Sequence, residues 1–166
     1  EAKPYTKTKH HYGSRLVFDK KGYLFISVGE RGQEKIFPQD LTTAPGKIHR
    51  INDDGSIPKD NPFVNKGKAV ASIYAYGNRN PQGMTMDPVT GLIWETEHGP
   101  RGGDELNIIK SGANYGWPVI SYGINYDGKP ITSISKKEGM EQPQTYWIPS
   151  IAPSGLTFVT GDKYPA

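Results

Sequence analysis

The segments Gly13-Ser-Arg-Leu-Val-Phe-Asp19 and Tyr23-Leu-Phe-Ile-Ser-Val-Gly29, joined by Lys20-Lys-Gly22, decide the fold of this chain. Both are rich in branched and aromatic residues that favour strands, and a short glycine-containing turn connects them. This arrangement predicts a β-hairpin. Because a hairpin brings its two ends together, the residues just before the first segment and just after the second are expected to share one face.

The same pattern recurs along the chain. Gln82-Gly-Met-Thr-Met-Asp87 leads through a Pro-Val-Thr-Gly turn to Leu92-Ile-Trp-Glu-Thr-Glu97, and Ser154-Gly-Leu-Thr-Phe-Val-Thr160 begins it a third time. Repeated hairpins indicate a β-propeller, although these copies lie about 70 residues apart, against roughly 40 to 50 residues in an ordinary blade. No long segment has helical periodicity, so we predict an all-β chain that covers two to three blades. Further short strands are expected at 47–51, 69–75, 105–109 and 117–121.

The composition excludes several classes of protein and site. Only 34% of the 166 residues are hydrophobic, and 20 glycines, 14 prolines and 10 tyrosines favour turn-rich β architecture. The chain has no cysteine, which excludes disulfides, thiolate metal sites and thiol nucleophiles. Its net charge of +3 is spread too thinly to indicate a nucleic-acid partner, and no apolar run approaches the roughly 20 residues of a membrane span. Both ends interrupt the pattern, so we expect a fragment of a longer protein.

A histidine pair, His10 and His11, immediately precedes the first predicted strand. Histidine can act as a general base because its ordinary pKa lies near neutrality. Glu30 follows the second strand, and the hairpin is expected to bring it to His11, where a carboxylate would fix the imidazole tautomer and raise its basicity. The alternative is that the histidines are plain loop residues and that Glu30 forms a surface ion pair with Arg31 or Lys35.

The second hairpin carries polar groups at both of its open ends. On one side, Arg79 in Tyr76-Gly-Asn-Arg-Asn-Pro-Gln-Gly83 offers five donors in one plane, which suits carboxylates and developing oxyanions. Packing over the abundant tyrosines is the alternative role for Arg79. On the other side, Glu97-His-Gly-Pro-Arg-Gly-Gly-Asp-Glu105 combines carboxylates with loop carbonyls, the ligands that calcium prefers. The two loops together predict a binding or catalytic site.

Taken together, these motifs resemble the glucose/sorbosone dehydrogenase family, the soluble aldose sugar dehydrogenases that use pyrroloquinoline quinone (PQQ). The resemblance runs from His11 to the end of the chain and rests on HYGSRLVFD, YGNRNPQG, EHGPRGGDELN, NYGWP and GMEQPQTYWIPSIAPSG, in that order. It implies a six-bladed β-propeller with the quinone at the top of the central channel. Family members are longer than this chain, so residues 1–166 are expected to be part of a single propeller domain.

The resemblance also implies roles for individual residues. His11 matches the general base that takes the proton from the anomeric hydroxyl while hydride passes to the quinone, with Glu30 as its partner. Arg79 matches the arginine beside the quinone carbonyls, where it would stabilise the oxyanion that forms on reduction. Asn80 accompanies it, and Tyr126 matches a tyrosine at the cofactor site.

The resemblance implies calcium as a second cofactor. Glu105 and Tyr115 match one calcium site, and the backbone of Gly99 and Pro100 matches carbonyls that hold the calcium beside the quinone. Two further positions fall where family members approach substrate and quinone: Trp147 and Ser150.

Two positions depart from the family pattern. Glu30 stands where the family usually has aspartate, which changes its reach to His11, and Asn78 replaces a histidine. Both departures bear on rate and substrate preference. The family lysines and arginines that bind the quinone carboxylates lie beyond Ala166, so this segment alone is expected to bind the cofactor poorly.

The sequence therefore predicts a PQQ- and calcium-dependent enzyme that oxidises the C1 hydroxyl of aldose sugars to lactones. Two alternatives stay open: a non-catalytic propeller that binds sugar or protein, and a calcium-dependent, lactonase-like propeller that hydrolyses its substrate without quinone. An aldose is the expected partner, and nucleic acid is not. The resemblance implies a periplasmic or secreted location and allows a homodimer of the longer protein.

Overall fold

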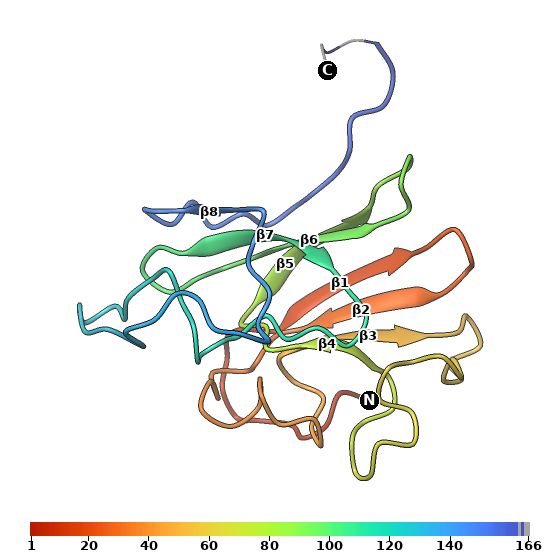
Figure 1. Ribbon diagram of the computed structural model, residues 1–166, viewed down its shortest axis with the longest axis horizontal. Helices are drawn as coiled ribbons and strands as arrows, with labels where there is room; N and C mark the ends of the chain where they lie inside the picture. Colours follow the sequence, from red (N-terminus) through yellow and green to blue (C-terminus); the bar gives the residue numbers. More distant parts are fainter. Residues whose placement is uncertain (163, 165–166) are drawn as a thin grey trace.

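The computed structural model describes residues 1–162 and 164 and is all-β (Figure 1). Eight strands form two four-stranded antiparallel sheets, and these residues contain no α-helix. In the same part of the chain, no helix is long and apolar enough to cross a membrane. The prediction of an all-β chain is confirmed.

The first sheet contains the first predicted hairpin. Asp19 shapes its turn, because its Oδ1 accepts hydrogen bonds from the backbone N–H of Lys21 at 2.8 Å and of Tyr23 at 2.9 Å. The pairing of Gly13 with Val28 closes the open end of the hairpin and brings the flanking residues onto one face. The strands lie in chain order: β1 (Gly13–Phe18), β2 (Leu24–Val28), β3 (Lys47–Ile51) and β4 (Ile73–Tyr76).

The second sheet repeats this design. Asp87 shapes the β5–β6 turn, where its Oδ1 accepts the N–H of Val89 at 2.8 Å. At the open end, Pro81 pairs with Glu97, so the loops before β5 and after β6 lie together as predicted. The strands again lie in chain order: β5 (Pro81–Met86), β6 (Ile93–Glu97), β7 (Asp104–Ile109) and β8 (Thr145–Trp147).

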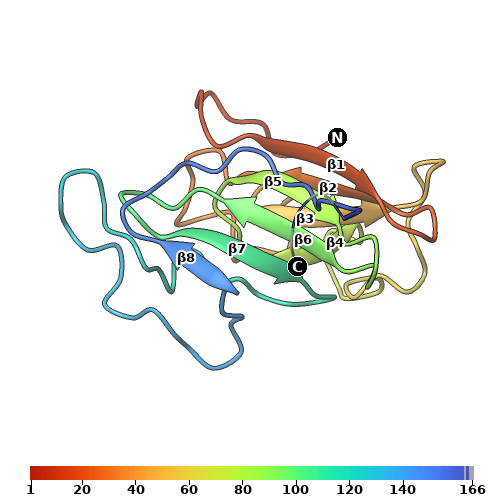
Figure 2. The same ribbon diagram turned by 90° about the horizontal axis from the view of Figure 1, so that it is seen from above.

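The two sheets are neighbouring blades of a β-propeller, with β1 and β5 side by side (Figures 1 and 2). Ser27 Oγ donates to Pro81 O at 3.2 Å, and the Arg15 guanidinium donates to Gln82 O, so the adjacent hairpins are tied at their open ends. One apolar cluster joins the blades, and burying it removes apolar surface from water. Its fully buried members are Phe25, Ile48, Ala75, Met84, Ile93, Ile109 and Tyr115.

Three predicted strands differ from the structure. The segment 117–121 is a turn rather than a strand, because Trp117 N–H donates to Gly77 O at 2.8 Å and Pro118 has no N–H to give to a ladder. Only the end of the predicted strand at 69–75 forms β4. The short strand β8 has no counterpart among the predictions.

The third difference concerns Ser154–Thr160. This segment was expected to begin a third hairpin, but it is not a strand. It runs along the second blade: Phe158 packs edge-to-face on Trp94 with the ring centres 5.9 Å apart, and Leu156 lies beside Gly83. The innermost strand of a blade hydrogen-bonds only to the second strand of its own blade. No such partner is present in the described part of the chain, so the segment has no ladder.

Candidate functional site

The first hairpin brings His11 and Glu30 into direct contact. His11 Nδ1 is hydrogen-bonded to the Glu30 carboxylate, whose other oxygen accepts the backbone N–H of Gln33. Glu30 is fully buried, so the alternative of a surface ion pair with Arg31 or Lys35 is wrong. With Nδ1 engaged, the Nε2 atom of His11 is the ring nitrogen left to meet a substrate. His11 has φ = 59°, a left-handed conformation that is uncommon outside glycine and recurs at functional sites.

A backbone hydrogen bond links this pair to the second blade. The N–H of Glu30 donates to Arg79 O at 2.9 Å. The N–H groups of Arg79 and Asn80 donate in turn to the buried Glu97 carboxylate, at 2.6 and 3.2 Å. The histidine of one hairpin and the arginine of the next are therefore held at fixed positions by two buried glutamates.

The Arg79 side chain is buried and only partly engaged. Its Nη1 donates to His98 O at 3.1 Å and to Gly99 O at 2.7 Å, and its guanidinium lies over the Trp117 ring, 5.2 Å from the ring centre. The Nε atom is buried without a partner in the protein. Arg79 thus packs on a tryptophan rather than on tyrosines.

A cleft with a volume of about 250 Å³ lies between the blades at this end of the molecule. Four of the residues that the sequence singled out line this cleft: His11, Glu30, Arg79 and Tyr126. Asn80 is not among the lining residues. Its side-chain oxygen accepts the backbone N–H of Gly13 at 3.1 Å, so it supports the junction of the two hairpins from behind.

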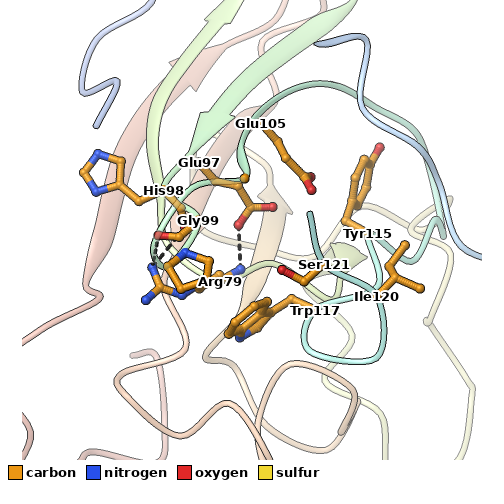
Figure 3. Close-up of a pocket in the computed structure, with 11 residues that line it drawn as sticks. Arg79, Glu97, His98, Gly99, Glu105, Tyr115, Trp117, Ile120 and Ser121 are labelled. Atoms are coloured by element: carbon orange, nitrogen blue, oxygen red, sulfur yellow. Dashed lines mark hydrogen bonds between the residues drawn. The ribbon is translucent and has the colours of Figure 1, made fainter. Parts of the chain in front are cut away.

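A smaller cavity of about 20 Å³ adjoins the cleft and shares Arg79, Pro100 and Trp117 with it (Figure 3). All four predicted metal ligands line this cavity: Gly99, Pro100, Glu105 and Tyr115. Glu97 lines it as well, opposite Glu105 in the β6–β7 ladder. The two proposed calcium positions therefore meet in one small space with two carboxylates.

The acids of this cavity are held largely away from water. Burial, reinforced by the charge of Glu97, raises the pKa of Glu105 to about 8. Burial also raises the pKa of Glu97 to about 7, against the opposing effect of its hydrogen bonds from Arg79 and Asn80. Glu95 is fully buried and lies two residues before Glu97 on β6. Burial and the charge of Glu97 raise the pKa of Glu95 well above its ordinary range. Such a site attracts a cation, whose charge would favour ionisation of these carboxyls.

The cavity offers a hard cation oxygen ligands, but few of them come from side chains. Among residues 1–162 and 164, no three acidic or histidine side chains converge closely enough to hold a metal, so backbone carbonyls would have to complete the ligand shell. Tyr115 can supply only its carbonyl, because its hydroxyl donates to Ile108 O at 2.6 Å and accepts from Lys110 N–H at 2.9 Å. Glu105 keeps a free carboxylate oxygen beside its weak contact with Asn107.

Comparison with known proteins agrees with this geometry. The sequence model of the family described as Glucose / Sorbosone dehydrogenase matches residues 1–166. The chain belongs to this family. It is 51% identical over 164 residues to the aldose sugar dehydrogenase YliI of Escherichia coli K12, covering 98% of this chain and 44% of YliI.

Solved structures of glucose/sorbosone dehydrogenases share the fold. The apo-form crystal structure of the soluble aldose sugar dehydrogenase of E. coli matches with a TM-score of 0.91 and 51% identity, over 95% of this chain and 46% of that one. The PQQ-bound aldose sugar dehydrogenase of Streptomyces coelicolor matches with a TM-score of 0.69 and 33% identity, over 88% and 39%. The chain spans less than half the length of these relatives.

Ser150 lies outside the cleft that this family member forms between its blades. It lines a neighbouring open hollow that shares Pro100 and Tyr126 with the cleft, and its hydroxyl donates to Asp104 at 2.7 Å. Trp147, in β8, takes part through its backbone, where its carbonyl accepts Gly103 N–H at 2.8 Å. The roles of both residues toward substrate and quinone stay predictions.

Sequence reasoning missed several residues that shape the site. Glu97 was noted only as part of an acidic turn, although its place opposite Pro81 in the hairpin could have placed it beside Arg79. Trp117 lies in the segment 117–121, for which a strand was expected, and a strand there does not predict its contact with Arg79. Glu34 and Lys35 line the cleft from the β2–β3 loop, where no local signal in the sequence marks them.

Proposed function

We propose that this chain is the part of a PQQ-dependent dehydrogenase that carries its proton-accepting histidine. The reaction is the oxidation of the C1 hydroxyl of an aldose to the lactone. The observation that supports it most directly is the hydrogen-bonded His11–Glu30 pair, joined by the backbone bond from Glu30 to Arg79 and facing the same cleft. A buried carboxylate, an imidazole and an arginine in one cleft suit removal of a proton and a hydride from an alcohol.

The cleft fits a planar, acidic quinone. Its volume of about 250 Å³ is close to the lower end of the range of about 300 to 1,000 Å³ that is typical of small-molecule sites. The Arg79 guanidinium, which lines the cleft, offers N–H donors and a positive charge to a quinone oxygen, and Lys35 offers a positive charge to a carboxylate. Trp117 and Tyr126 provide aromatic walls. PQQ, when bound, would supply the two-electron acceptor for the reaction.

His11 would act through its Nε2 atom. Glu30 holds Nδ1, which fixes the tautomer and stabilises the imidazolium after proton transfer. His11 would take the hydroxyl proton of the sugar as the C1–O bond becomes the carbonyl of the lactone, and a bound quinone would supply the acceptor for the C1 hydride. Arg79 would stabilise the negative charge that develops on the acceptor oxygen.

Calcium would occupy the small cavity beside the cleft. The Glu105 and Glu97 carboxylates and the carbonyls of Gly99, Pro100 and Tyr115 are the hard oxygen donors that calcium prefers. Gly99 O already accepts a hydrogen bond from Arg79, so a cation here would act on the same loop that positions the arginine.

The replacement His11→Gln tests the proposed base. Positioned acid–base catalysis contributes on the order of 100- to 10,000-fold, so kcat for aldose oxidation should fall by at least about 100-fold while quinone affinity changes little. The measurement is dye reduction by the complete protein, reconstituted with PQQ and calcium. His10→Gln is the matched control, because His10 is the exposed neighbouring histidine and does not line the cleft. Activity that survives His11→Gln would overturn the assignment of the base.

The two alternatives give different results in the same assay. A non-catalytic propeller would bind sugar without dye reduction, even with quinone and calcium present. A lactonase-like propeller would hydrolyse a lactone with calcium alone. Quinone-dependent dye reduction with an aldose would dispose of both.

We further propose that residues 1–166 form part of a single propeller domain in a longer, periplasmic or secreted protein. The first sheet supports this, because apolar residues such as Ile26 and Ile51 line an uncovered hollow beside it. Coexpression of this segment with the rest of the chain tests it. Assembly into one particle with quinone affinity is expected, whereas two independently folded parts would contradict it.

A further inference from the structure

Asp104, at the start of β7, accepts more hydrogen bonds than any group discussed above. Its Oδ1 accepts Gly99 N–H at 2.8 Å, and its Oδ2 accepts Ser150 Oγ–H, Ile151 N–H and Ala152 N–H, each at 2.7 Å. The side chain is fully buried. These four donors come from two separate loops, so the two oxygens of one buried side chain link the loops to each other.

The two linked loops both border the proposed site. Gly99 presents its carbonyl to Arg79 Nη1 at 2.7 Å, and it lines the cavity proposed for calcium. Ser150 lines the hollow that adjoins the cleft, and Ala152 has φ = 49°, a conformation that needs external support outside glycine. Asp104 therefore fixes the position of one wall through contacts 46 to 48 residues away in the sequence.

The same arrangement occurs at the other two junctions. Glu30 binds His11 just before β1, and Glu97 binds the backbone of Arg79 and Asn80 just before β5. Asp104 binds the residues just before the third repeat of the hairpin pattern, 154–160. In each case a buried carboxylate anchors the segment that leads toward an innermost strand position. At the first two junctions, that segment carries a side chain of the proposed site.

We propose that Asp104 is a positioning residue, which sets Gly99 against Arg79 and holds Ser150–Ala152 beside the hollow that adjoins the cleft. This inference rests on the proposed function, because it concerns the alignment of the arginine and the calcium ligands. Asp104 does not line the cleft or the small cavity, so it acts through the two loops.

Asp104→Asn tests the proposal because the amide keeps the shape but offers one acceptor and one donor group. Whichever way the amide turns, its NH2 faces a backbone N–H, so one of the two loops loses its anchor. In the complete protein, we expect faster amide hydrogen exchange at Gly99 or at Ile151 and Ala152. Calcium affinity, measured by calorimetric titration of the apoprotein, should weaken by about 10- to 100-fold, as is usual for groups that orient metal ligands. Quinone affinity, measured by quenching of tryptophan fluorescence, should weaken in parallel.

Asp87→Asn is the matched control. Asp87 also accepts a backbone N–H and a hydroxyl, from Val89 and Thr90, but it lies in the turn at the far end of its hairpin. This variant should lose stability without changing affinity for calcium or quinone. Ser150→Ala removes one donor to Asp104 and serves as a milder variant if Asp104→Asn does not fold, with an expected few-fold loss of quinone affinity.

The outcomes separate this inference from the proposed function. Faster exchange with unchanged calcium and quinone affinities would show that Asp104 is structural only and would overturn the positioning role. Unchanged exchange at both loops would overturn the link itself. A wild-type protein that binds neither quinone nor calcium would contradict the proposed function and, with it, the positioning role.

Discussion

Arg79 combines two tasks that a lysine could not perform together. Its Nη1 is shared between two loop carbonyls, while its planar guanidinium lies over Trp117. A lysine ammonium is a point charge without a fork or a flat face. The consequence is that the preference for arginine here is geometric as well as electrostatic.

We expect Arg79→Lys to weaken quinone binding by about 10- to 100-fold, since charged hydrogen bonds contribute about 1.5 to 3 kcal/mol and tenfold is about 1.4 kcal/mol. Fluorescence titration of the complete protein with PQQ measures this change. Arg101→Lys is the control, because Arg101 is an exposed arginine outside the cleft. Equal affinity in the Arg79 variant and the wild type would refute the proposed contact with the quinone.

At the scale of elements, the open end of the first hairpin is packed as tightly as backbone allows. A Cβ added at Gly29 would lie 2.2 Å from the carbonyl oxygen of His11, a separation that real Cβ atoms do not adopt. The loop that carries His11 can approach β2 only because residue 29 has no side chain. The hairpin therefore sets the distance between His11 and Glu30.

Gly29→Ala should separate His11 from Glu30 and so lower kcat by about 100-fold, the low end of what acid–base catalysis contributes. Steady-state kinetics with an aldose measures the loss, and the quinone affinity should change much less. Gly155→Ala is the control, since a Cβ there meets nothing within 4 Å. If the two variants were equally active, the tight approach at Gly29 would have no bearing on the reaction.

At the scale of the whole molecule, two buried bases couple stability to pH. Burial lowers the pKa of Lys47 to about 7, against the opposing charge of Asp40, and burial lowers the pKa of His49 to about 4. Lys47 Nζ donates to Phe37 O at 2.6 Å and Pro45 O at 2.8 Å, which fastens the long β2–β3 loop onto β3. Both groups lie inside the first blade, where burial disfavours their charged forms.

We expect the free energy of unfolding to rise with pH between about 7 and 10.5 because of Lys47. In that window the unfolded chain binds a proton that the folded chain does not, which gives at most about 1.4 kcal/mol per pH unit. His49 contributes a rise between about 4 and 6.5 for the same reason. Urea unfolding across this range measures both.

Lys47→Met should abolish the upper part of this rise and lower stability, because two buried carbonyls lose their donor at about 1 to 3 kcal/mol each. Lys21→Met, at an exposed turn position, should leave the profile unchanged. A Lys47→Met protein that kept the full rise above pH 7 would show that the lysine is charged in the folded state.

Strand hairpins were accessible from sequence because their signals are local. The turns at Asp19 and Asp87 and the flanking strand formers lie within a few residues of each other, and hairpin pairing then placed His11 beside Glu30 and Arg79 beside Glu97. The segment 117–121 was misassigned because Pro118 and a contact with distant Gly77 outweighed its strand-forming residues. Local propensity is a weak guide wherever a segment is held by remote partners.

The sequence by itself determined the all-β architecture and the repeated hairpins, and it singled out His11 and Arg79 as candidate residues of the site. Only the tertiary structure decided that Glu97 and Asp104 anchor their loops, that Trp117 supports Arg79, and that the predicted calcium ligands share one cavity. The physical reason is separation along the chain: Glu97 binds Arg79 across 18 residues, and Asp104 binds Ile151 across 47. Contacts over such distances depend on how the strands of the second blade pair and how its loops fold back, and no local pattern of residues specifies them.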